Sequence, residues 1–249
     1  MSATAAPVAV VVGGGGGIGS AICRRLAADG HAVVVGYATS RDRAEALANE
    51  LGGTPHAAMK IDNTDSNALG SVAARIGSKV GRVDVLVNCG GVTRPVAHDD
   101  LDNLDDELID RIFAVNWRGP FATIRAFRPL LEAAPSPVVV NISSVAAVMG
   151  IGSNVAYCAS KAALDSMTRS LARSLAPTIR VMSVSPGWVL GEYAASMPEG
   201  LVDAQKAVTP LARLASGDDV AAAVSAVVHD LPMTTGAIIP VDGGRPLGI

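Results

Sequence analysis

Tyr157 and Lys161 are the pair of residues in this sequence whose types and spacing point most directly to chemistry. They stand four positions apart within residues 155–175, a stretch with helical periodicity, so both side chains are expected on one face of a helix. A phenol with a pKa of about 10 exchanges protons poorly near neutral pH. A nearby ammonium group favours the phenolate and lowers that pKa, so the pair could act as a general acid and base.

Such a pair taken alone is more often structural than catalytic, because Tyr and Lys four positions apart occur on many helices. Its surroundings favour the catalytic interpretation. The apolar run 137–142 is predicted to be a strand, and Ser143 and Ser144 follow it directly. In open parallel sheets, ligands bind beyond the carboxyl ends of the strands. A serine hydroxyl that directly follows a strand could therefore reach a substrate oxygen there.

An uninterrupted run of glycine from Gly13 to Gly17, followed by Ile18 and Gly19, comes directly after the apolar run 8–12. Glycine has no Cβ, so the backbone can turn sharply and approach a pyrophosphate, and the next helix presents free N–H groups to it. The run fits several registers of the Gly-x-Gly-x-x-Gly pattern, so the spacing assigns no role to each residue. A dinucleotide-binding turn is favoured over a purely structural one.

The residues after the second apolar run bear on the choice between NAD(H) and NADP(H). A carboxylate there would bind a free ribose hydroxyl and repel a 2′-phosphate. The sequence instead offers Tyr37, Ser40, Arg41 and Arg43, and hydroxyl and guanidinium groups suit a phosphate. NADP(H) is therefore favoured. NAD(H) stays possible, because Ser40 could simply cap a helix and the arginines could be solvated.

The chain alternates short valine-rich runs with longer amphipathic stretches, a pattern typical of βαβ units. The predicted strands are 8–12, 32–36, 56–61, 83–87, 137–142, 180–184 and 237–241. The predicted helices are 18–29, 41–51, 66–79, 155–175 and 218–231. Since no repeat or polar linker divides the chain, we predict a single α/β domain over residues 1–249, with a doubly wound, seven-stranded parallel sheet of the Rossmann-like type.

Composition narrows the class of function. The net charge of -3 and the pI near 5.8 provide no basic field for nucleic acid, and no apolar run is long enough to span a membrane. Three cysteines without a Cys-x-x-Cys pair and four scattered histidines predict no metal site and suit a reducing compartment. We expect a cytoplasmic protein that acts on small molecules.

Taken in order, the motifs of this sequence resemble those of the short-chain dehydrogenase/reductase family, and the resemblance covers nearly the whole chain. They are Gly13-x-x-x-Gly17-Ile18-Gly19, Asp62, Asn88-Cys89-Gly90-Gly91, Asn116, Asn141-Ile142-Ser143-Ser144, Tyr157-x-x-x-Lys161 and Pro186-Gly187. The resemblance implies an NAD(P)-dependent oxidoreductase that interconverts a carbonyl and an alcohol by hydride transfer. It also implies a homotetramer.

The same resemblance implies a role for each motif residue. Tyr157 would be the general acid or base, and Lys161 would lower its pKa and hold the ribose. Ser144 would bind the substrate oxygen, and Asn116 would position a water next to Lys161. The cofactor-binding set would be Gly13, Gly17, Ile18, Gly19, Tyr37, Ser40, Arg41, Asp62, Asn63, Asn88, Tyr157, Lys161, Pro186, Gly187 and Val189. For two of these a structural role stays open, because Asp62 could cap the next helix and Asn88 could close a turn.

Three positions depart from the family's pattern. Val12 and Gly191 stand where the family usually has threonine, and Cys89 stands where it usually has asparagine. The turns that contain Val12 and Cys89 pack together in the family, so their joint change could be self-consistent. The departures keep a catalytically silent nucleotide-binding scaffold as an alternative of another class.

The substrate is expected to meet the loop 145–154, Trp188 and the segment 189–208 with Tyr193, Met197 and Leu201. These residues are mostly apolar, so a neutral carbonyl compound or alcohol of moderate size is expected. A β-ketoacyl-acyl-carrier-protein reductase is the alternative among enzymes. It is less favoured because the stretch between Arg128 and Lys161 has no Lys or Arg to attract an acidic carrier protein.

Overall fold

The computed structural model of the chain describes residues 6–191 and 200–247. Its strands form one sheet in the order β3-β2-β1-β4-β5-β6-β7, and every neighbouring pair is parallel. The strands are β1 (Val8–Val12), β2 (Ala32–Tyr37), β3 (Ala57–Lys60), β4 (Val85–Asn88), β5 (Val138–Ile142), β6 (Arg180–Pro186) and β7 (Ile238–Val241). The predicted seven-stranded, doubly wound parallel sheet is confirmed.

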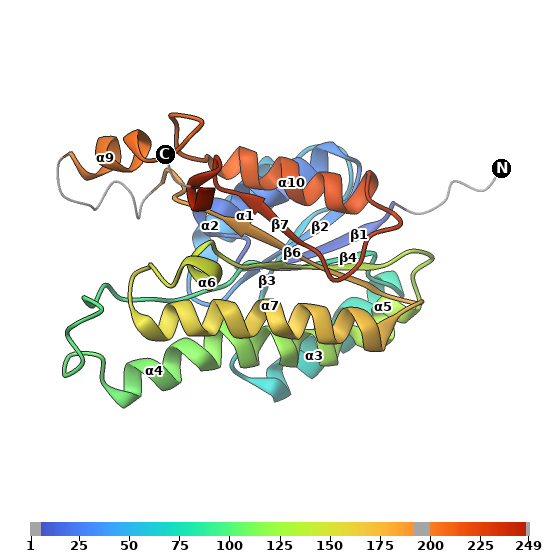
Figure 1. Ribbon diagram of the computed structural model, residues 1–249. Coiled ribbons are helices and arrows are strands. Elements are labelled where there is room, and N and C mark those ends of the chain that lie inside the picture. Colours follow the sequence, from blue (N-terminus) through green and yellow to red (C-terminus); the bar gives the residue numbers. More distant parts are fainter. Residues whose placement is uncertain (1–5, 192–199, 248–249) are drawn as a thin grey trace.

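Helices cover both faces of this sheet (Figure 1). One face carries α1 (Gly17–Ala28), α2 (Arg41–Glu50) and α10 (Gly217–His229), and the other carries α3 (Ser66–Val80), α5 (Gly119–Glu132) and α7 (Val155–Leu175). The described chain also contains α4 (Asp106–Phe113), the π-helix η1 (Ala114–Arg118), α6 (Ala146–Met149), α9 (Leu201–Ala207) and the 3₁₀ helix η2 (Arg245–Leu247). The strand order reverses between β1 and β4, where such sheets bind ligands beyond the carboxyl ends of their strands.

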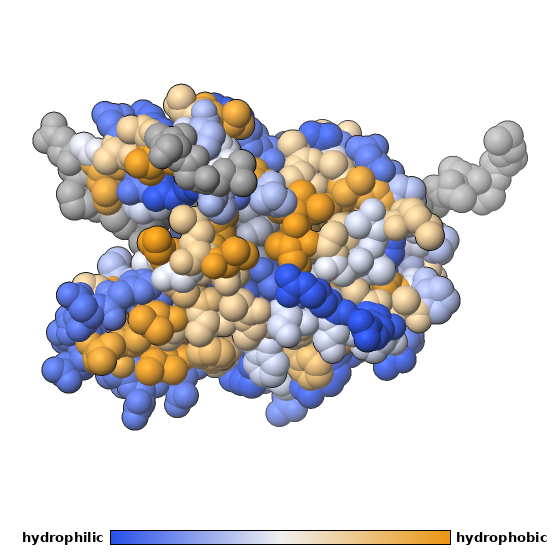
Figure 2. Space-filling view, in the orientation of Figure 1, coloured by the Kyte–Doolittle hydropathy of each residue, from blue (hydrophilic) through white to orange (hydrophobic). Residues whose placement is uncertain are grey.

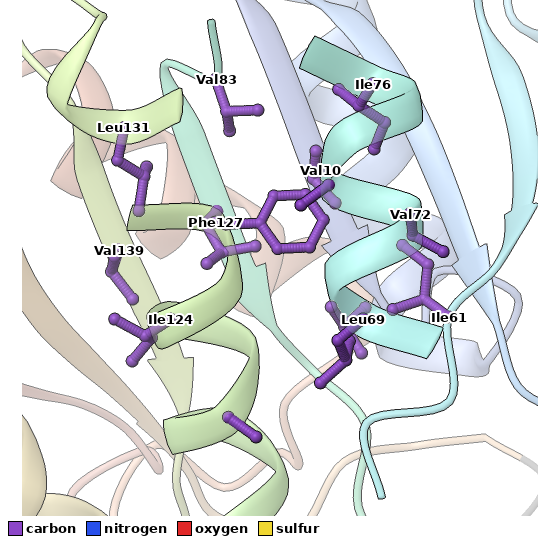
Figure 3. Close-up of a cluster of buried hydrophobic side chains, with 14 of the residues drawn as sticks. Val10, Ile61, Leu69, Val72, Ile76, Val83, Ile124, Phe127, Leu131 and Val139 are labelled. Atoms are coloured by element: carbon purple, nitrogen blue, oxygen red, sulfur yellow. The ribbon is translucent and has the colours of Figure 1, made fainter. Parts of the chain in front are cut away.

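Successive residues of the central strands serve two separate cores. Val10 packs into the core under α3 and α5, whereas its neighbours Ala9 and Val11 pack into the core under α1 and α10. Figure 3 shows Phe127 of α5 at the centre of the first core, pointing from α5 toward α3. Full burial of such a side chain stabilises the fold by about 2–3 kcal/mol. Burial on both faces explains why these strands are continuously apolar rather than alternating.

Most predicted boundaries agree with the structure within two residues, and the differences have local causes. Strand β4 begins at Val85 rather than at position 83, because the Val83 N–H donates to Leu130 O of α5 instead of to a neighbouring strand. Helices α4 and α5 and the π-helix η1 have no counterpart in the predicted elements. Pro120 and Pro129 make α5 hard to predict from the sequence, because proline disfavours a helix interior. Pro120 lies in the first turn of α5, where a missing N–H costs little.

No helix within residues 6–191 and 200–247 is long and apolar enough to cross a membrane. The same residues contain no group of three or more His, Cys, Asp or Glu side chains that could hold a metal ion. Cys23, Cys89 and Cys158 are unpaired thiols.

Candidate active site

Helix α7 carries Tyr157 in its first turn, and the cap of that helix fixes its position. Asn154 is completely buried and accepts a hydrogen bond from the Tyr157 N–H through Oδ1 at 2.7 Å. Its Nδ2 donates to Arg94 O at 2.8 Å. The cap therefore satisfies a free helix N–H and ties the start of α7 to the loop after β4.

Lys161 lies one turn further along α7 and is buried beneath the tyrosine. Its Nζ is 5.8 Å from the centre of the Tyr157 ring and donates a hydrogen bond to Ile142 O of β5 at 2.8 Å. Burial lowers the pKa of the Lys161 ammonium to about 8, because the charged form loses hydration. The group is thus mostly protonated at neutral pH, with a pKa much closer to neutrality than that of an exposed lysine.

Asn116 belongs to the π-helix η1, an irregular element often found at functional sites. Its Oδ1 accepts from the Val92 N–H at 2.8 Å, and its Nδ2 donates to Val92 O at 3.0 Å and to Ser160 Oγ at 3.1 Å. Ser160 Oγ in turn donates to Tyr157 O at 2.8 Å. Asn116 therefore joins the loop after β4 to the turn of α7 that lies between Tyr157 and Lys161.

A cavity of about 620 Å³ opens in front of this helix. Ser144 and Tyr157 line it together with Ile18, Pro186, Gly187 and Val189, so six of the predicted site residues meet there. Further lining residues are largely apolar, among them Val145, Met149, Ile151, Trp188 and Leu201. Figure 2 shows the surface notched between the part that carries α9 and the lower part that carries α4.

The two serines after β5 have different surroundings. Ser143 is buried, and its Oγ donates toward Lys161 O at 3.4 Å. Ser144 is half-buried, and its Oγ accepts from the Ala146 N–H at 3.2 Å. Because that bond uses a lone pair and not the hydrogen, the Ser144 hydroxyl can still donate to a ligand in the cavity.

The glycine turn between β1 and α1 is held by close backbone contacts. Gly13 has a φ of +77°, and a Cβ there would lie 2.8 Å from the Gly90 nitrogen. A Cβ on Gly19 would overlap the carbonyl oxygen of Gly13. The turn after β1 and the turn after β4 are therefore in contact, and the Cys89 N–H also donates to Val12 O at 3.0 Å. This bare backbone at a helix N-terminus fits a pyrophosphate.

Replacing Gly19 by alanine is expected to weaken dinucleotide binding at least tenfold and to lower the free energy of unfolding by about 2–3 kcal/mol, because the new methyl group overlaps the Gly13 carbonyl. Gly70→Ala is the matched control. Apart from its chain neighbours and the backbone of its own helix, no atom lies within 4 Å of a Cβ on Gly70, an exposed residue inside α3. This change should therefore stabilise the protein by about 0.5–1 kcal/mol. Fluorescence titration with NADPH and thermal unfolding measure both effects, and equal behaviour of the two variants would contradict the assignment.

The residues predicted at the adenosine end lie at the ends of β3 and β4. Asn88 is buried and donates through Nδ2 to Asn141 Oδ1 at 2.9 Å, but its own Oδ1 has no hydrogen-bond partner among the described residues. Asp62 Oδ1 accepts from the Thr64 N–H at 2.9 Å and from Thr64 Oγ1 at 2.6 Å, and these bonds lower the pKa of Asp62. Asp62 therefore closes a turn and does not cap α3, whose N-cap is Asp65. The unused Asn88 oxygen fits a ligand donor.

Asn63 has a structural contact of its own. Its Nδ2 donates to Val115 O of η1 at 2.9 Å, and a Cβ on Gly119 would overlap its amide group. The buried side chain therefore joins the end of β3 to the π-helix that carries Asn116.

The residues predicted to select the nucleotide lie at the end of β2 and just after it, and they do not line the cavity. Tyr37 is the last residue of β2, and a Cβ on Gly15 would lie 2.8 Å from Ser40 Oγ, so Ser40 adjoins the glycine turn. Ser40 precedes α2 without capping it through its side chain. The Arg41 Nε forms an exposed ion pair with Glu45 Oε1 at 2.7 Å, so the guanidinium would have to exchange this partner to bind a phosphate.

Several residues that organise the site were not among those singled out in the sequence. Asn154 and Ser160 hold Tyr157 and Asn116 in place, and only the preference of asparagine for helix N-caps could have indicated the first. Gln205 and Arg245 also line the cavity. Tyr193 and Met197, expected near the substrate, lie outside the described residues.

This geometry defines a class of enzyme. A glycine turn at the switch point of a doubly wound sheet suits a dinucleotide, and a tyrosine beside a buried ammonium suits proton transfer to an oxygen in the adjoining cavity. Together they are typical of an oxidoreductase that uses a nicotinamide cofactor.

Comparison with known proteins gives the family. A family model described as enoyl-(acyl carrier protein) reductase matches residues 13–245. A protein described as ketoacyl reductase 2 of the granaticin polyketide synthase of Streptomyces violaceoruber is 34% identical over 97% of this chain and 97% of its own length. The 3-oxoacyl-acyl-carrier-protein reductase FabG of Staphylococcus aureus is 31% identical over 95% of this chain and 96% of its own length.

A crystal structure described as a short-chain dehydrogenase/reductase of Burkholderia xenovorans superposes with a TM-score of 0.89 at 33% identity, covering 99% of this chain and 100% of that one. The chain belongs to the short-chain dehydrogenase/reductase family and is an oxidoreductase with a nicotinamide cofactor.

Proposed function

We propose that this oxidoreductase interconverts the carbonyl and alcohol forms of a small molecule, with Tyr157 as the general acid and base. One observation carries the proposal: Tyr157 and Ser144 line one cavity, and the buried ammonium of Lys161 lies behind the tyrosine ring. A substrate oxygen in that cavity could then contact both hydroxyl groups.

In the reducing direction, the Tyr157 hydroxyl gives its proton to the substrate oxygen while the Ser144 hydroxyl donates a hydrogen bond to the same oxygen. When bound, the reduced nicotinamide cofactor would supply the hydride for the carbonyl carbon. The Lys161 ammonium stabilises the phenolate that remains on Tyr157, because an adjacent positive charge favours the ionised phenol. Asn116 holds the loop and helix that flank Lys161 and would position a water beside it. In the oxidising direction the same proton moves back to Tyr157.

We assign the cofactor site to three groups of residues. The pyrophosphate would lie on Gly13, Gly17, Ile18 and Gly19; the adenosine end would meet Tyr37, Ser40, Arg41, Asp62, Asn63 and Asn88; and the nicotinamide end would meet Tyr157, Lys161, Pro186, Gly187 and Val189. The methyl-free turn and the unpartnered Asn88 oxygen support this assignment. The segment that follows Pro186 is tied to residue 215, since the Leu190 N–H donates to Ala215 O at 2.8 Å.

The preferred nucleotide is proposed to be NADP(H). If a 2′-phosphate displaces Glu45 from Arg41, the Arg41→Ala change should raise the dissociation constant for NADPH about tenfold and leave that for NADH unchanged. Arg24→Ala is the matched control, because it also removes an exposed Arg–Glu pair, with Glu50. Fluorescence titrations of wild type and both variants with NADPH and with NADH measure the six dissociation constants. Equal effects on both nucleotides would rule out phosphate recognition by Arg41.

A β-ketoacyl thioester is the second candidate substrate, because two relatives are named as ketoacyl reductases. Turnover of acetoacetyl-CoA against simple ketones separates the candidates. Turnover of the thioester alone would favour a β-ketoacyl thioester as the substrate. Turnover of free ketones would favour a small carbonyl compound.

We further propose a single domain over residues 1–249, a homotetramer and a cytoplasmic location. Trp117 and Phe121 support self-association, since these stacked rings are 37% and 38% exposed on the side of the molecule that carries α5. The unpaired thiols support a reducing compartment. Light scattering of the purified protein gives the oligomeric state.

A further inference from the structure

Arg245 is the one arginine or lysine among the described residues that line the 620 Å³ cavity. That lining contains no aspartate or glutamate. The Nη1 atom of Arg245 is buried and has no hydrogen-bond partner within the described chain. Gln205 of α9 lines the same cavity, and its buried Oε1 also lacks a partner there. Two polar groups with an unsatisfied atom thus border a cavity whose other lining residues are largely apolar.

The backbone that brings Arg245 to the cavity is firmly held. β7 ends at Val241, and in the turn that follows the Gly244 N–H donates to Asp242 Oδ1 at 2.8 Å. The Leu211 N–H donates to Gly243 O at 3.1 Å, which ties this turn to the segment after α9. The Asp242 carboxylate therefore stabilises the turn and forms no ion pair with Arg245 within the described residues.

A buried guanidinium nitrogen without a hydrogen-bond partner, such as Arg245 Nη1 among the described residues, is costly. A shielded cation loses hydration, and the loss is offset only when an anion or several acceptors replace the water. Water or a ligand hydroxyl can satisfy Gln205, which is neutral. A negative charge in the cavity is the partner that best matches Arg245, because guanidinium binds carboxylate through two parallel hydrogen bonds.

We propose that Arg245 binds a carboxylate of the substrate, so that the substrate is an oxo acid, or the matching hydroxy acid, with an apolar body. The proposal rests on the proposed function and names the substrate class of the same site. Met149, Ile151 and Leu201 would line the apolar body, while the carbonyl carbon lies at Tyr157. The sequence predicted a neutral substrate from the loop 145–154 and the segment 189–208. Arg245, which follows β7, lies outside both and changes that expectation.

Binding of simple probes tests the proposal without any need for turnover. The probes are levulinate, its homologues with one and two more methylenes, and the methyl ester of each acid. Binding to the NADPH-loaded protein is followed by tryptophan fluorescence, since Trp188 lines the cavity. At least one acid should bind wild type better than its ester. Arg245→Met should weaken that binding about 30-fold and change ester binding less than threefold.

Two further variants keep the result interpretable. Arg245→Lys retains the charge and should restore part of the affinity for the acid, which a purely structural role of the side chain would not require. Arg75→Met removes an exposed arginine of α3 that does not line the cavity and should leave acid binding unchanged. Equal binding of acids and esters, or equal losses for both in Arg245→Met, would overturn the proposal.

The anion could also belong to the nucleotide, and NADPH titration of each variant separates the two sources. The proposal expects the dissociation constant for NADPH to change less than twofold in Arg245→Met. A loss of NADPH affinity as large as the loss of acid affinity would assign Arg245 to the cofactor and contradict the proposal. Failure of the proposed function would look different: the acids would bind as described, but no carbonyl compound would be reduced.

Discussion

Replacing Tyr157 by phenylalanine is expected to lower kcat for carbonyl reduction about a thousandfold, with little change in the affinity for NADPH. The phenol lines the cavity and is the group proposed to give a proton to the substrate oxygen, and a positioned acid contributes about 10²–10⁴ to a rate. Only the hydroxyl is removed, so the ring still packs beside Lys161. Steady-state turnover and a nucleotide titration measure the two quantities.

Ser174→Ala is the matched control for Tyr157→Phe. It removes a hydroxyl from the exposed last turn of the same helix, where Ser174 Oγ donates to Ser170 O at 2.6 Å. Its turnover should equal that of wild type. A Tyr157→Phe protein that keeps more than a tenth of the wild-type kcat would remove the tyrosine from the acid–base role.

Replacing Lys161 by methionine is expected to lower kcat/KM at least a hundredfold, because the phenolate of Tyr157 loses its neighbouring charge and the ribose loses a donor. The wild-type pH profile carries a second signature. Burial lowers the pKa of Lys161 to about 8, so the ammonium is lost as pH rises through that value. For wild type, kcat/KM should therefore fall above about pH 8. The residual kcat/KM of Lys161→Met should not show this fall.

Stability gives an independent check on Lys161. Its pKa in the folded protein lies below the ordinary value of 10.5, so between about pH 8 and 10.5 the unfolded chain binds more protons than the native protein. The contribution of this group to the free energy of unfolding therefore rises with pH across that window, and Lys161→Met should lack the rise. If the free energy of unfolding depended on pH identically in both proteins, the lowered pKa of the buried Lys161 would be contradicted.

The sheet could be predicted from the sequence because its strands are buried on both faces. Continuous apolar runs such as Val8–Val12 have few alternatives to a central parallel strand. The predicted helix 155–175 has the same limits as α7, since its periodicity is regular and Asn154 caps it. The helices between β4 and β5 could not be predicted from periodicity, because Pro129 lies inside α5 and a π-helix joins α5 to α4.

The site could be predicted as a set of residues but not as a set of contacts. Spacing placed Tyr157 and Lys161 on one helix face, but the bond from Lys161 to Ile142 O depends on how α7 crosses β5. The Arg41–Glu45 pair depends on which charges meet in space, and so does the lack of a partner for Arg245 Nη1 among the described residues. Arg245 follows the last strand in the sequence, and no motif marks it.

Deuterium transfer tests the central claim of a nicotinamide-dependent carbonyl reductase most directly. NADPH labelled with deuterium at C4 of the nicotinamide is supplied with a panel of ketones and oxo acids, and the alcohol product is analysed by mass spectrometry. We predict one deuterium on the former carbonyl carbon of the product. Tight binding of NADPH without any labelled alcohol across the panel would contradict the claim and favour a nucleotide-binding protein without catalytic activity.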